Sequence, residues 1–178
     1  YDQMQRKALQ VETLSQVSET VASSRLIKDV LELLVTMTAQ MMNSKICSIM
    51  LLDEASGELR IASTQSLSEQ YRRKPNLKVG QSIIGRAVKE RRPIIVLDVS
   101  TERDYMYPEM AKKEGLCSLL SVPMMVRDKA LGVINSYTSA PHVFTSEEGK
   151  LLQAIANQAA VAIEHTTLIE KSHEMQEA

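Results

Sequence analysis

Residues 115–138, GLCSLLSVPMMVRDKALGVINSYT, decide the fold. Cys117 to Val126 are almost continuously apolar, and Ala130 to Thr138 alternate small, branched and polar side chains. The charged cluster Arg127-Asp128-Lys129 separates the two runs, so the pattern predicts two buried antiparallel strands joined by a polar turn in the middle of a sheet. Pro123 lacks an N–H, which indicates a bulge or a position whose N–H side has no neighbouring strand.

The flanking segments predict the remaining elements. Apolar residues at helical spacing and turn residues between apolar runs give, in chain order, a helix at Arg25–Met42, strands at Ile46–Leu52 and Glu58–Thr64, a helix at Ser82–Arg91, a strand at Ile94–Leu97, a turn or short helix near Pro108 and a final helix opened by Thr145 and Glu148. Consecutive hairpins require antiparallel pairing. The predicted fold class is therefore α+β, with a central antiparallel sheet of five or six strands.

Composition excludes several classes of protein. The 178 residues carry a net charge of −1, which gives no general attraction to nucleic acid or to an anionic membrane. No apolar run is long enough to cross a bilayer, and no basic-then-apolar signal segment opens the chain. We therefore expect a cytoplasmic segment of a longer protein, without nucleic-acid or membrane contact.

Both ends of the chain have the spacing of helices that pair with a partner. Met4, Val11, Leu14 and Val21 form a thin apolar stripe within residues 1–23, and such a helix needs a partner to be stable in water. The final helix carries a three-four alternation from Leu152 to Gln176. We expect a parallel homodimer, with these interface residues: Val11, Leu14, Leu152, Ile155, Ala159, Ala162 and Ile169.

Three stretches carry a resemblance to a known family. The central hairpin, VGQSIIGRAVKERRPIIVLDVS before it and FTSEEGKLLQAIANQAAVAIEH after it together resemble a GAF domain, a sensory and dimerisation module of signalling proteins. The resemblance implies that the terminal helices lie on one face of the sheet and that loop-helix crossovers close a pocket on the other. The expected division is a linker helix at 1–23, a GAF domain at 24–165 and a helical extension at 166–178 that leads to an output domain.

Little in the sequence favours catalysis. The sequence holds no Ser-His-Asp set, no glycine loop that would bind a phosphate and no cluster with the spacing of metal ligands. No catalytic or metal-ligating residue is therefore assigned. One branch of the GAF family reduces free methionine sulfoxide with cysteines. Cys47 and Cys117 lie in apolar strands, where burial raises a thiol pKa and opposes that chemistry. A thiol reductase is therefore the least favoured of the functions considered.

The candidate ligand-binding residues lie in the long connection after Leu97 and in the strand that follows it. Loops carry function, tyrosines offer a flat face and a hydroxyl, and polar groups inside a buried strand must find partners. The candidates are Asp98, Tyr105, Tyr107, Cys117, Ser118 and Ser121.

The sequence leaves the nature of the ligand open. Residues 69–92 hold eight Lys and Arg against two Glu, which suits an anionic metabolite or a nucleotide but equally a solvated crossover. The signature of cyclic-nucleotide-binding GAF domains begins Asn-Lys, whereas Asn135 is followed here by Ser136, so we do not expect a cyclic nucleotide. No cofactor is identified. The alternative to a sensor is a GAF domain that binds no ligand and serves as a dimerising spacer.

Overall fold

The computed structural model describes residues 27–66, 69–72 and 76–177, with side chains described as far as Thr166 in the last helix. The elements are, in chain order, α2 (Ile27–Met42), β1 (Ile46–Asp53), β2 (Glu58–Thr64), α3 (Glu69–Arg72), β3 (Leu77–Lys78), α4 (Ser82–Glu90), β4 (Ile94–Val96), α5 (Pro108–Glu114), β5 (Leu119–Val126), β6 (Lys129–Tyr137) and α6 (Ser146–Glu177). The α+β fold predicted from the sequence is confirmed. The predicted helix at residues 1–23 lies outside the described residues.

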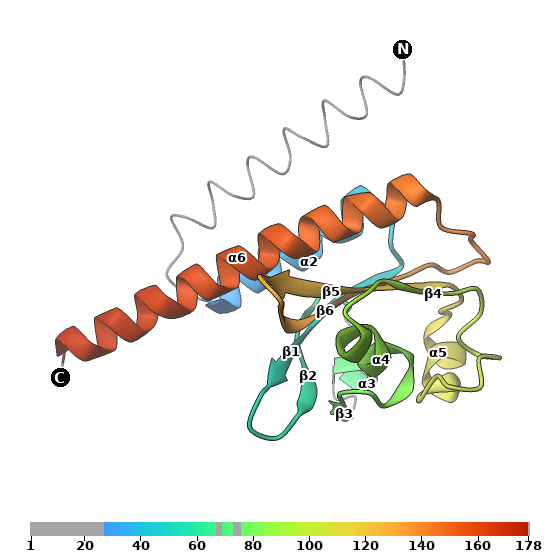
Figure 1. Cartoon of the computed structure of the whole chain (residues 1–178). Coiled ribbons are helices and arrows are strands. Elements are labelled where there is room, and N and C mark those ends of the chain that lie inside the picture. The colour runs from blue at the N-terminus through green and yellow to red at the C-terminus, as the bar shows by residue number, and fades with distance from the viewer. Residues whose placement is uncertain (1–26, 67–68, 73–75, 178) are drawn as a thin grey trace, which may run out of the picture.

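The strands form one antiparallel sheet of six, in the order β3-β2-β1-β6-β5-β4. The hairpin of β5 and β6 lies inside this sheet, and its register pairs Leu119 with Tyr137 at one end and Val126 with Lys129 at the turn. Long helices lie on one side of the sheet and short helices on the other (Figure 1). The hairpin that decides the fold from the sequence is therefore also its structural centre.

Pro123 occupies a position that suits a residue without an N–H. Its carbonyl oxygen accepts a hydrogen bond from Gln153 Nε2 at 3.3 Å, so this part of the backbone points away from β6. On that side β4 has already ended, because its last pair joins Ile94 to Ser121. A bulge follows between Met124 and Met125. Of the two alternatives expected for Pro123, the structure has the position whose N–H side has no neighbouring strand, because the bulge lies beyond Met124.

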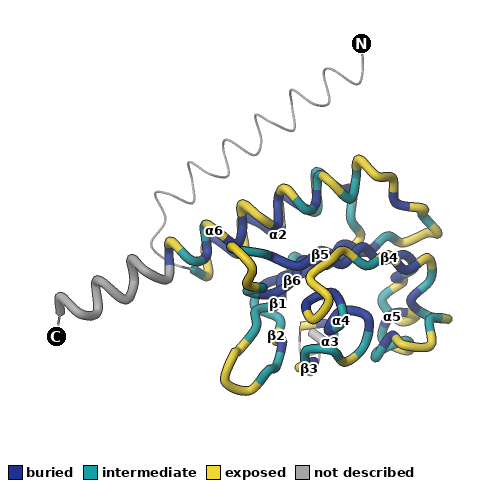
Figure 2. The backbone as a smooth tube through the Cα atoms, in the orientation of Figure 1, coloured by how far each residue is buried: buried dark blue, intermediate teal, exposed yellow. Residues whose placement is uncertain are grey.

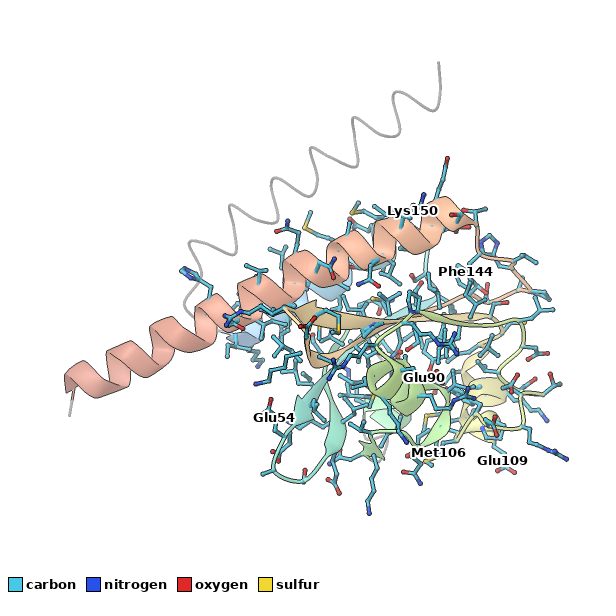
Figure 3. The ribbon with its side chains drawn as sticks, in the orientation of Figure 1. Glu54, Glu90, Met106, Glu109, Phe144 and Lys150 are labelled. Atoms are coloured by element: carbon cyan, nitrogen blue, oxygen red, sulfur yellow. The ribbon has the colours of Figure 1, made fainter. Side chains whose placement is uncertain are left out.

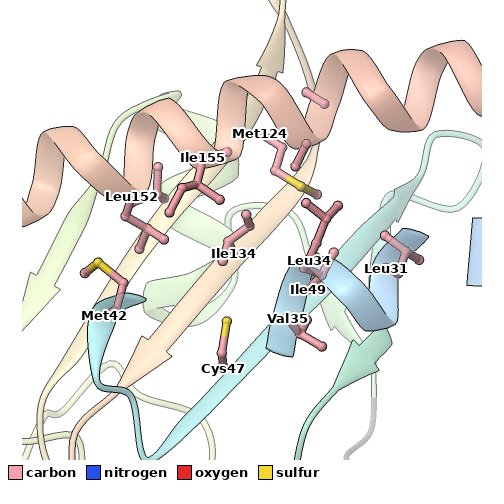
Figure 4. Close-up of a cluster of buried hydrophobic side chains, with 14 of the residues drawn as sticks. Leu31, Leu34, Val35, Met42, Cys47, Ile49, Met124, Ile134, Leu152 and Ile155 are labelled. Carbon is pink, nitrogen blue, oxygen red and sulfur yellow. The ribbon is translucent and has the colours of Figure 1, made fainter. Parts of the chain in front are cut away.

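The helix side of the sheet holds a large apolar core. Helices α2 and α6 pack against each other and against β1 and β5, as a wide apolar face on each helix requires. Figure 4 shows this cluster, in which the labelled side chains are Leu31, Leu34, Val35, Met42, Cys47, Ile49, Met124, Ile134, Leu152 and Ile155. Burial of these side chains supplies most of the free energy that holds both helices on the sheet.

The opposite face of the sheet is covered by short elements. Helices α3, α4 and α5 and the connection between β4 and α5 enclose a second core that includes Met50, Leu59, Ile84 and Val133. In Figure 2 the strands β5 and β6 are largely buried, whereas the turn between β1 and β2 is exposed. This face is the one on which the GAF resemblance predicts a pocket.

The start of α6 has the capping arrangement predicted from the sequence. Thr145 N donates to Glu148 Oε1 at 2.9 Å, and Glu148 N donates to Thr145 Oγ1 at 3.1 Å. Each side chain thus satisfies a backbone N–H that the helix leaves free. His142 Nε2 also contacts Glu148 Oε1 at 2.9 Å. Figure 3 places Phe144 in the connection that leads into this helix and Lys150 in its first turns.

Candidate ligand-binding site

A row of polar side chains crosses the three central strands on the face opposite α6. Ser48 of β1 pairs with Asn135 of β6, and Asn135 pairs with Ser121 of β5. Ser121 Oγ donates to Asn135 Oδ1 at 2.7 Å, and Asn135 Nδ2 lies 3.4 Å from Ser48 Oγ. All three side chains are fully buried. Alternation along the strands places them together, because residues opposite one another in a ladder share a face.

Three tyrosines extend this row into a network. Tyr71 of α3 donates from its hydroxyl to Ser48 Oγ at 3.0 Å. Tyr105, in the connection before α5, has its hydroxyl 2.8 Å from that of Tyr137 on β6. The rings of Tyr71 and Tyr105 both meet the ring of Tyr137 edge to face, at centroid distances of 6.3 and 6.4 Å. The two covering elements are thus joined to the sheet by aromatic and polar contacts together.

The network has no ionised member near neutral pH. Burial raises the pKa of Tyr105 to about 12, although its hydrogen bond with Tyr137 opposes the shift. The pKa values of Tyr71 and Tyr137 are also raised, chiefly by burial. Together with Ser48, Ser121 and Asn135, these residues offer hydroxyl and amide groups that both donate and accept. The chemistry at this site is therefore that of uncharged hydrogen bonding beside aromatic rings.

Of the predicted ligand-binding residues, the structure brings Tyr105 and Ser121 into this network. Tyr107 is partly buried against the core on this face of the sheet, and this partial burial raises its pKa. Asp98 instead caps a turn, where its Oδ1 accepts from Ser100 N at 2.9 Å and from Ser100 Oγ at 2.7 Å. These hydrogen bonds hold the pKa of Asp98 below its usual value.

Two further candidates hold backbone segments together at the edge of the sheet. Ser118 Oγ donates to the carbonyl of Leu97 and accepts from His142 N at 2.9 Å, so it links the ends of two connections. Cys117 Sγ lies 3.6 Å from the same carbonyl of Leu97. Ser118 is buried and Cys117 is half-buried, in contrast to the core position predicted for Cys117. The cysteine lies near the end of a strand, where the sheet covers it incompletely.

Four members of the network were not predicted as ligand-binding residues. They are Ser48, Tyr71, Asn135 and Tyr137. The argument made for Ser121, that a polar residue in a buried strand needs a partner, applies equally to Ser48 and Asn135. Tyr71 lay in a segment without clear periodicity, so the sequence held no comparable signal for it.

The described Lys and Arg side chains of residues 69–92 lie at the surface of the molecule. Arg86 is half-buried, and the others are exposed. Arg86 forms ion pairs with Glu90 at 3.7 Å and with Asp104 at 3.5 Å, and Arg92 pairs with Glu90 at 3.1 Å. Figure 3 shows Glu90 on α4, at the outside of the layer that covers the sheet. These contacts are typical of a solvated helix face.

The two cysteines lie in different environments. Cys47 is fully buried beneath the helices, and burial raises its pKa to about 12. A thiol with so high a pKa is almost entirely protonated near neutral pH, and the protonated thiol is a poor nucleophile. The core position predicted for Cys47 is confirmed.

The residues predicted for the dimer interface are distributed over different surroundings. Leu152, Ile155 and Ala159 are buried in the core of their own chain, and Ala162 is half-buried at its margin. The sheet-facing side of α6 is wider than predicted, because the helix packs on both β5 and α2. Outside the described side chains lie Val11, Leu14 and Ile169.

The sequence pattern of the GAF domain family matches residues 24–164. The chain therefore belongs to this family, whose members occur in signalling and regulatory proteins. It is 25% identical over 155 residues to the phosphoenolpyruvate-dependent phosphotransferase system protein of Escherichia coli, covering 87% of this chain and 21% of that protein. It is 26% identical over 155 residues to the Nif-specific regulatory protein of Herbaspirillum seropedicae, covering 84% of this chain and 28% of that protein. The chain thus spans well under half the length of these relatives.

Solved structures support the fold. The GAF domain of a phosphoenolpyruvate-protein phosphotransferase from Coxiella burnetii superposes with a TM-score of 0.80 at 23% identity, over 91% of this chain and 96% of that one. Free methionine-R-sulfoxide reductase from Neisseria meningitidis, solved with its substrate, gives a TM-score of 0.77 at 19% identity, over 91% and 92%. The same fold therefore serves regulatory domains and an enzyme. Among the described residues, no helix is both long and apolar enough to cross a bilayer.

Proposed function

We propose that this GAF domain is a regulatory, non-enzymatic sensor that binds a small molecule on the face of the sheet bearing Ser48, Ser121 and Asn135. The buried polar network is the observation that carries the proposal. A core needs no such groups for stability, because apolar residues of similar shape replace hydrogen-bonded pairs at little or no cost in free energy. Polar groups with both donor and acceptor capacity are what orients a ligand in an otherwise apolar site.

The chemistry of the network favours an uncharged polar ligand, such as an amide or a polyol. Every group in it is a hydroxyl or an amide, whereas Arg86 and Arg92 form ion pairs with acids at the surface. An anionic metabolite or a nucleotide would need a buried counter-charge. Displacement of Tyr71 or Tyr105 from the sheet would expose the row of polar groups to an uncharged ligand. An anionic ligand is the alternative outcome of the binding test.

A route from the site to α6 runs through the central strands. Ser121 and Asn135 face the proposed ligand, while their neighbours Val122 and Ile134 face the helices and belong to the helix-side core. Strand residues alternate between faces, so a shift of β5 or β6 moves both. Movement of α6 would pass to an output domain joined to the C-terminal end of this helix.

Dimerisation through the terminal helices is part of the proposal. Among the described side chains of α6, as far as Thr166, the exposed apolar residues are Ala154 and Val161, which lie two turns apart on the side away from the sheet. The sequence continues this spacing at Leu168. Apolar residues at heptad spacing pair helices in a coiled coil, and in a parallel pair the same positions of the two chains lie opposite one another. These positions complement the buried ones predicted from the sequence, because they are accessible to a second chain.

The test of the sensor is native mass spectrometry of the purified chain against its denatured mass, followed by thermal unfolding with amides, polyols and anionic metabolites. We expect a retained or added uncharged ligand that raises the unfolding temperature. Ser121→Ala should reduce this shift, whereas Ser136→Ala should not. Ser136 is a matched control because it is equally buried but bonds to Ser44 Oγ at 2.6 Å, away from the network. A shift with anions alone would overturn the uncharged class, and no shift with any of them favours the ligand-free spacer.

The test of the dimer is sedimentation of exposed Ala→Glu and Val→Glu variants. Ala154→Glu and Val161→Glu should weaken pairing through α6 by placing charge in the seam. Ala55→Glu, an equally exposed alanine in the turn between β1 and β2, is the control and should leave the mass unchanged. A wild-type chain that stays monomeric at high micromolar concentration would contradict this part of the proposal.

A further inference from the structure

Strand β4 forms one edge of the sheet and carries exposed apolar side chains. Its backbone pairs with β5 on one side only, from Ile94 to Val96. Ile95 is 53% exposed, and Leu97, directly after the strand, is 56% exposed. An edge with free backbone groups and apolar side chains is a template for another strand. In the strand order β4 is the last strand of the sheet and has only β5 as a neighbour.

The two edges of this sheet differ. The opposite edge, β3, consists of the buried Leu77 and the exposed Lys78, and a lysine on an edge discourages pairing. On β4 the outward side chains are apolar. Val143 is 76% exposed and lies nearby in the chain, because Ser118 Oγ bonds both the Leu97 carbonyl and His142 N. Three of the large apolar side chains exposed in the described part of the molecule therefore gather at this edge.

The sequence around β4 is complementary to itself when run antiparallel. Residues 91–98 read RRPIIVLD, with cations before the apolar run and an acid after it. If Ile95 of one chain lies opposite Ile95 of a second copy, Arg92 lies opposite Asp98 at each end. The Arg92 side chain is 59% exposed. Asp98 uses Oδ1 for the Ser100 turn, and Oδ2 has no hydrogen-bond partner in the described residues. Opposite charges facing each other across strands stabilise a pair.

We propose that β4 is a second self-association surface, on which two copies of this chain pair antiparallel about Ile95, with Arg92 of each copy opposite Asp98 of the other. The contact is isologous, as a two-fold pairing requires. Pro93 has no N–H to donate, and β4 is short, so the ladder is brief and the association is weaker than that of a permanent dimer. This surface is separate from α6. A chain that uses both contacts assembles beyond a dimer.

Cysteine cross-linking tests the register. Ile95→Cys, in a Cys117→Ser background, places two thiols opposite each other across the proposed two-fold axis. Leu97→Cys in the same background is the matched control, because its exposure is similar but the two thiols are displaced by four positions along the ladder, about 13 Å. A disulfide needs Cα atoms within about 7 Å. We expect Ile95→Cys to form a dimer on non-reducing electrophoresis at least about tenfold faster than Leu97→Cys.

The charge pair is tested in the Ile95→Cys chain. Arg92→Asp and Asp98→Arg should each slow cross-linking about two- to fivefold, and the two together should restore the rate, since the pair is re-formed with exchanged signs. A chain that also carries Ala154→Glu and Val161→Glu should cross-link through Ile95→Cys as before, which separates this contact from pairing through α6. Equal rates for Ile95→Cys and Leu97→Cys, or a double reversal slower than either single one, would overturn the proposal.

Discussion

The hydroxyl groups of Tyr105 and Tyr137 lie 2.8 Å apart, although 32 positions of the chain, including all of α5 and β5, separate the two residues. Tyr137 ends the central strand β6, whereas Tyr105 belongs to the irregular connection that covers the sheet. Both side chains are buried. This contact joins the covering connection to the sheet beside the proposed ligand site, and the ring of Tyr71 also meets the ring of Tyr137 edge to face.

Removing the hydroxyls of Tyr105 and Tyr137 should show whether their contributions to the free energy of unfolding depend on each other. Tyr105→Phe should lower the free energy of unfolding by about 1 kcal/mol, because Tyr137 keeps its contact with Tyr71. Tyr137→Phe should cost more, about 2 kcal/mol, since it leaves both other tyrosines without that partner. Urea unfolding measures each change. The double variant should cost less than the sum of the single ones, and simple additivity would show that the hydroxyls act independently.

Alkaline pH should destabilise the fold through the same tyrosines. The pKa of Tyr105 is raised from 10.0 to about 12, so the folded chain holds its proton where the unfolded chain releases it. Stability contributed by this group is therefore complete below pH 10 and is lost as the pH rises towards 12. Unfolding curves at a series of pH values should show this loss, and Tyr105→Phe should make it shallower. A loss of stability between pH 10 and pH 12 that is unchanged in Tyr105→Phe would contradict the prediction.

The fold could be predicted from the sequence because the residue pattern of each long element agrees with its place in the fold. The hairpin of β5 and β6, the capping residues Thr145 and Glu148 and the apolar face of α2 each have a pattern that admits one arrangement. Short elements were harder. Helix α3 and strand β3 have too few residues for a period to be seen, so their positions come from packing against the sheet.

The site was predicted only in part because it depends on pairing between distant strands. Ser121 could be recognised as a polar residue in a buried strand, but its partner Asn135 becomes evident only from the register of β5 against β6. The same holds for α6. Its period is visible in the sequence, yet which side faces the sheet depends on how the helix also meets α2, and Leu152, Ile155 and Ala159 are buried for that reason.

Two glycines provide a matched pair of stability tests. A Cβ at Gly132 would clash with the carbonyl oxygen of Met50 and approach Met124 Cε at 2.9 Å, because β6 runs close to β1 there. Gly132→Ala should therefore destabilise the fold by about 2 kcal/mol or more, as overpacking against backbone does. Gly149 has open space around its Cβ position and lies in the first turn of α6.

Because a Cβ at Gly149 meets no other atom, Gly149→Ala should stabilise the protein by about 0.5–1 kcal/mol, which is the gain in helix propensity. Thermal and urea unfolding of the two variants measure both effects. A neutral Gly132→Ala would show that β1 and β6 separate easily at this point, and a destabilising Gly149→Ala would show that this turn of α6 is not regular helix.

The capping box of α6 should make stability depend on acid pH. Burial alone would raise the pKa of Glu148, but the Thr145 N–H and His142 outweigh it and hold the pKa below 4.5. Its contribution is therefore present above the pKa of the unfolded chain and is lost as the pH falls from about 4.5 through the lower folded value. Glu148→Gln keeps an oxygen that accepts from Thr145 N–H but cannot titrate, so its unfolding free energy should fall less between neutral pH and pH 4. Thr145→Ala should cost about 1 kcal/mol at both pH values, since the hydroxyl cap does not ionise. If wild type and Glu148→Gln lose stability in parallel as the pH falls, the ionised carboxylate contributes nothing to the start of the helix beyond what a neutral amide supplies.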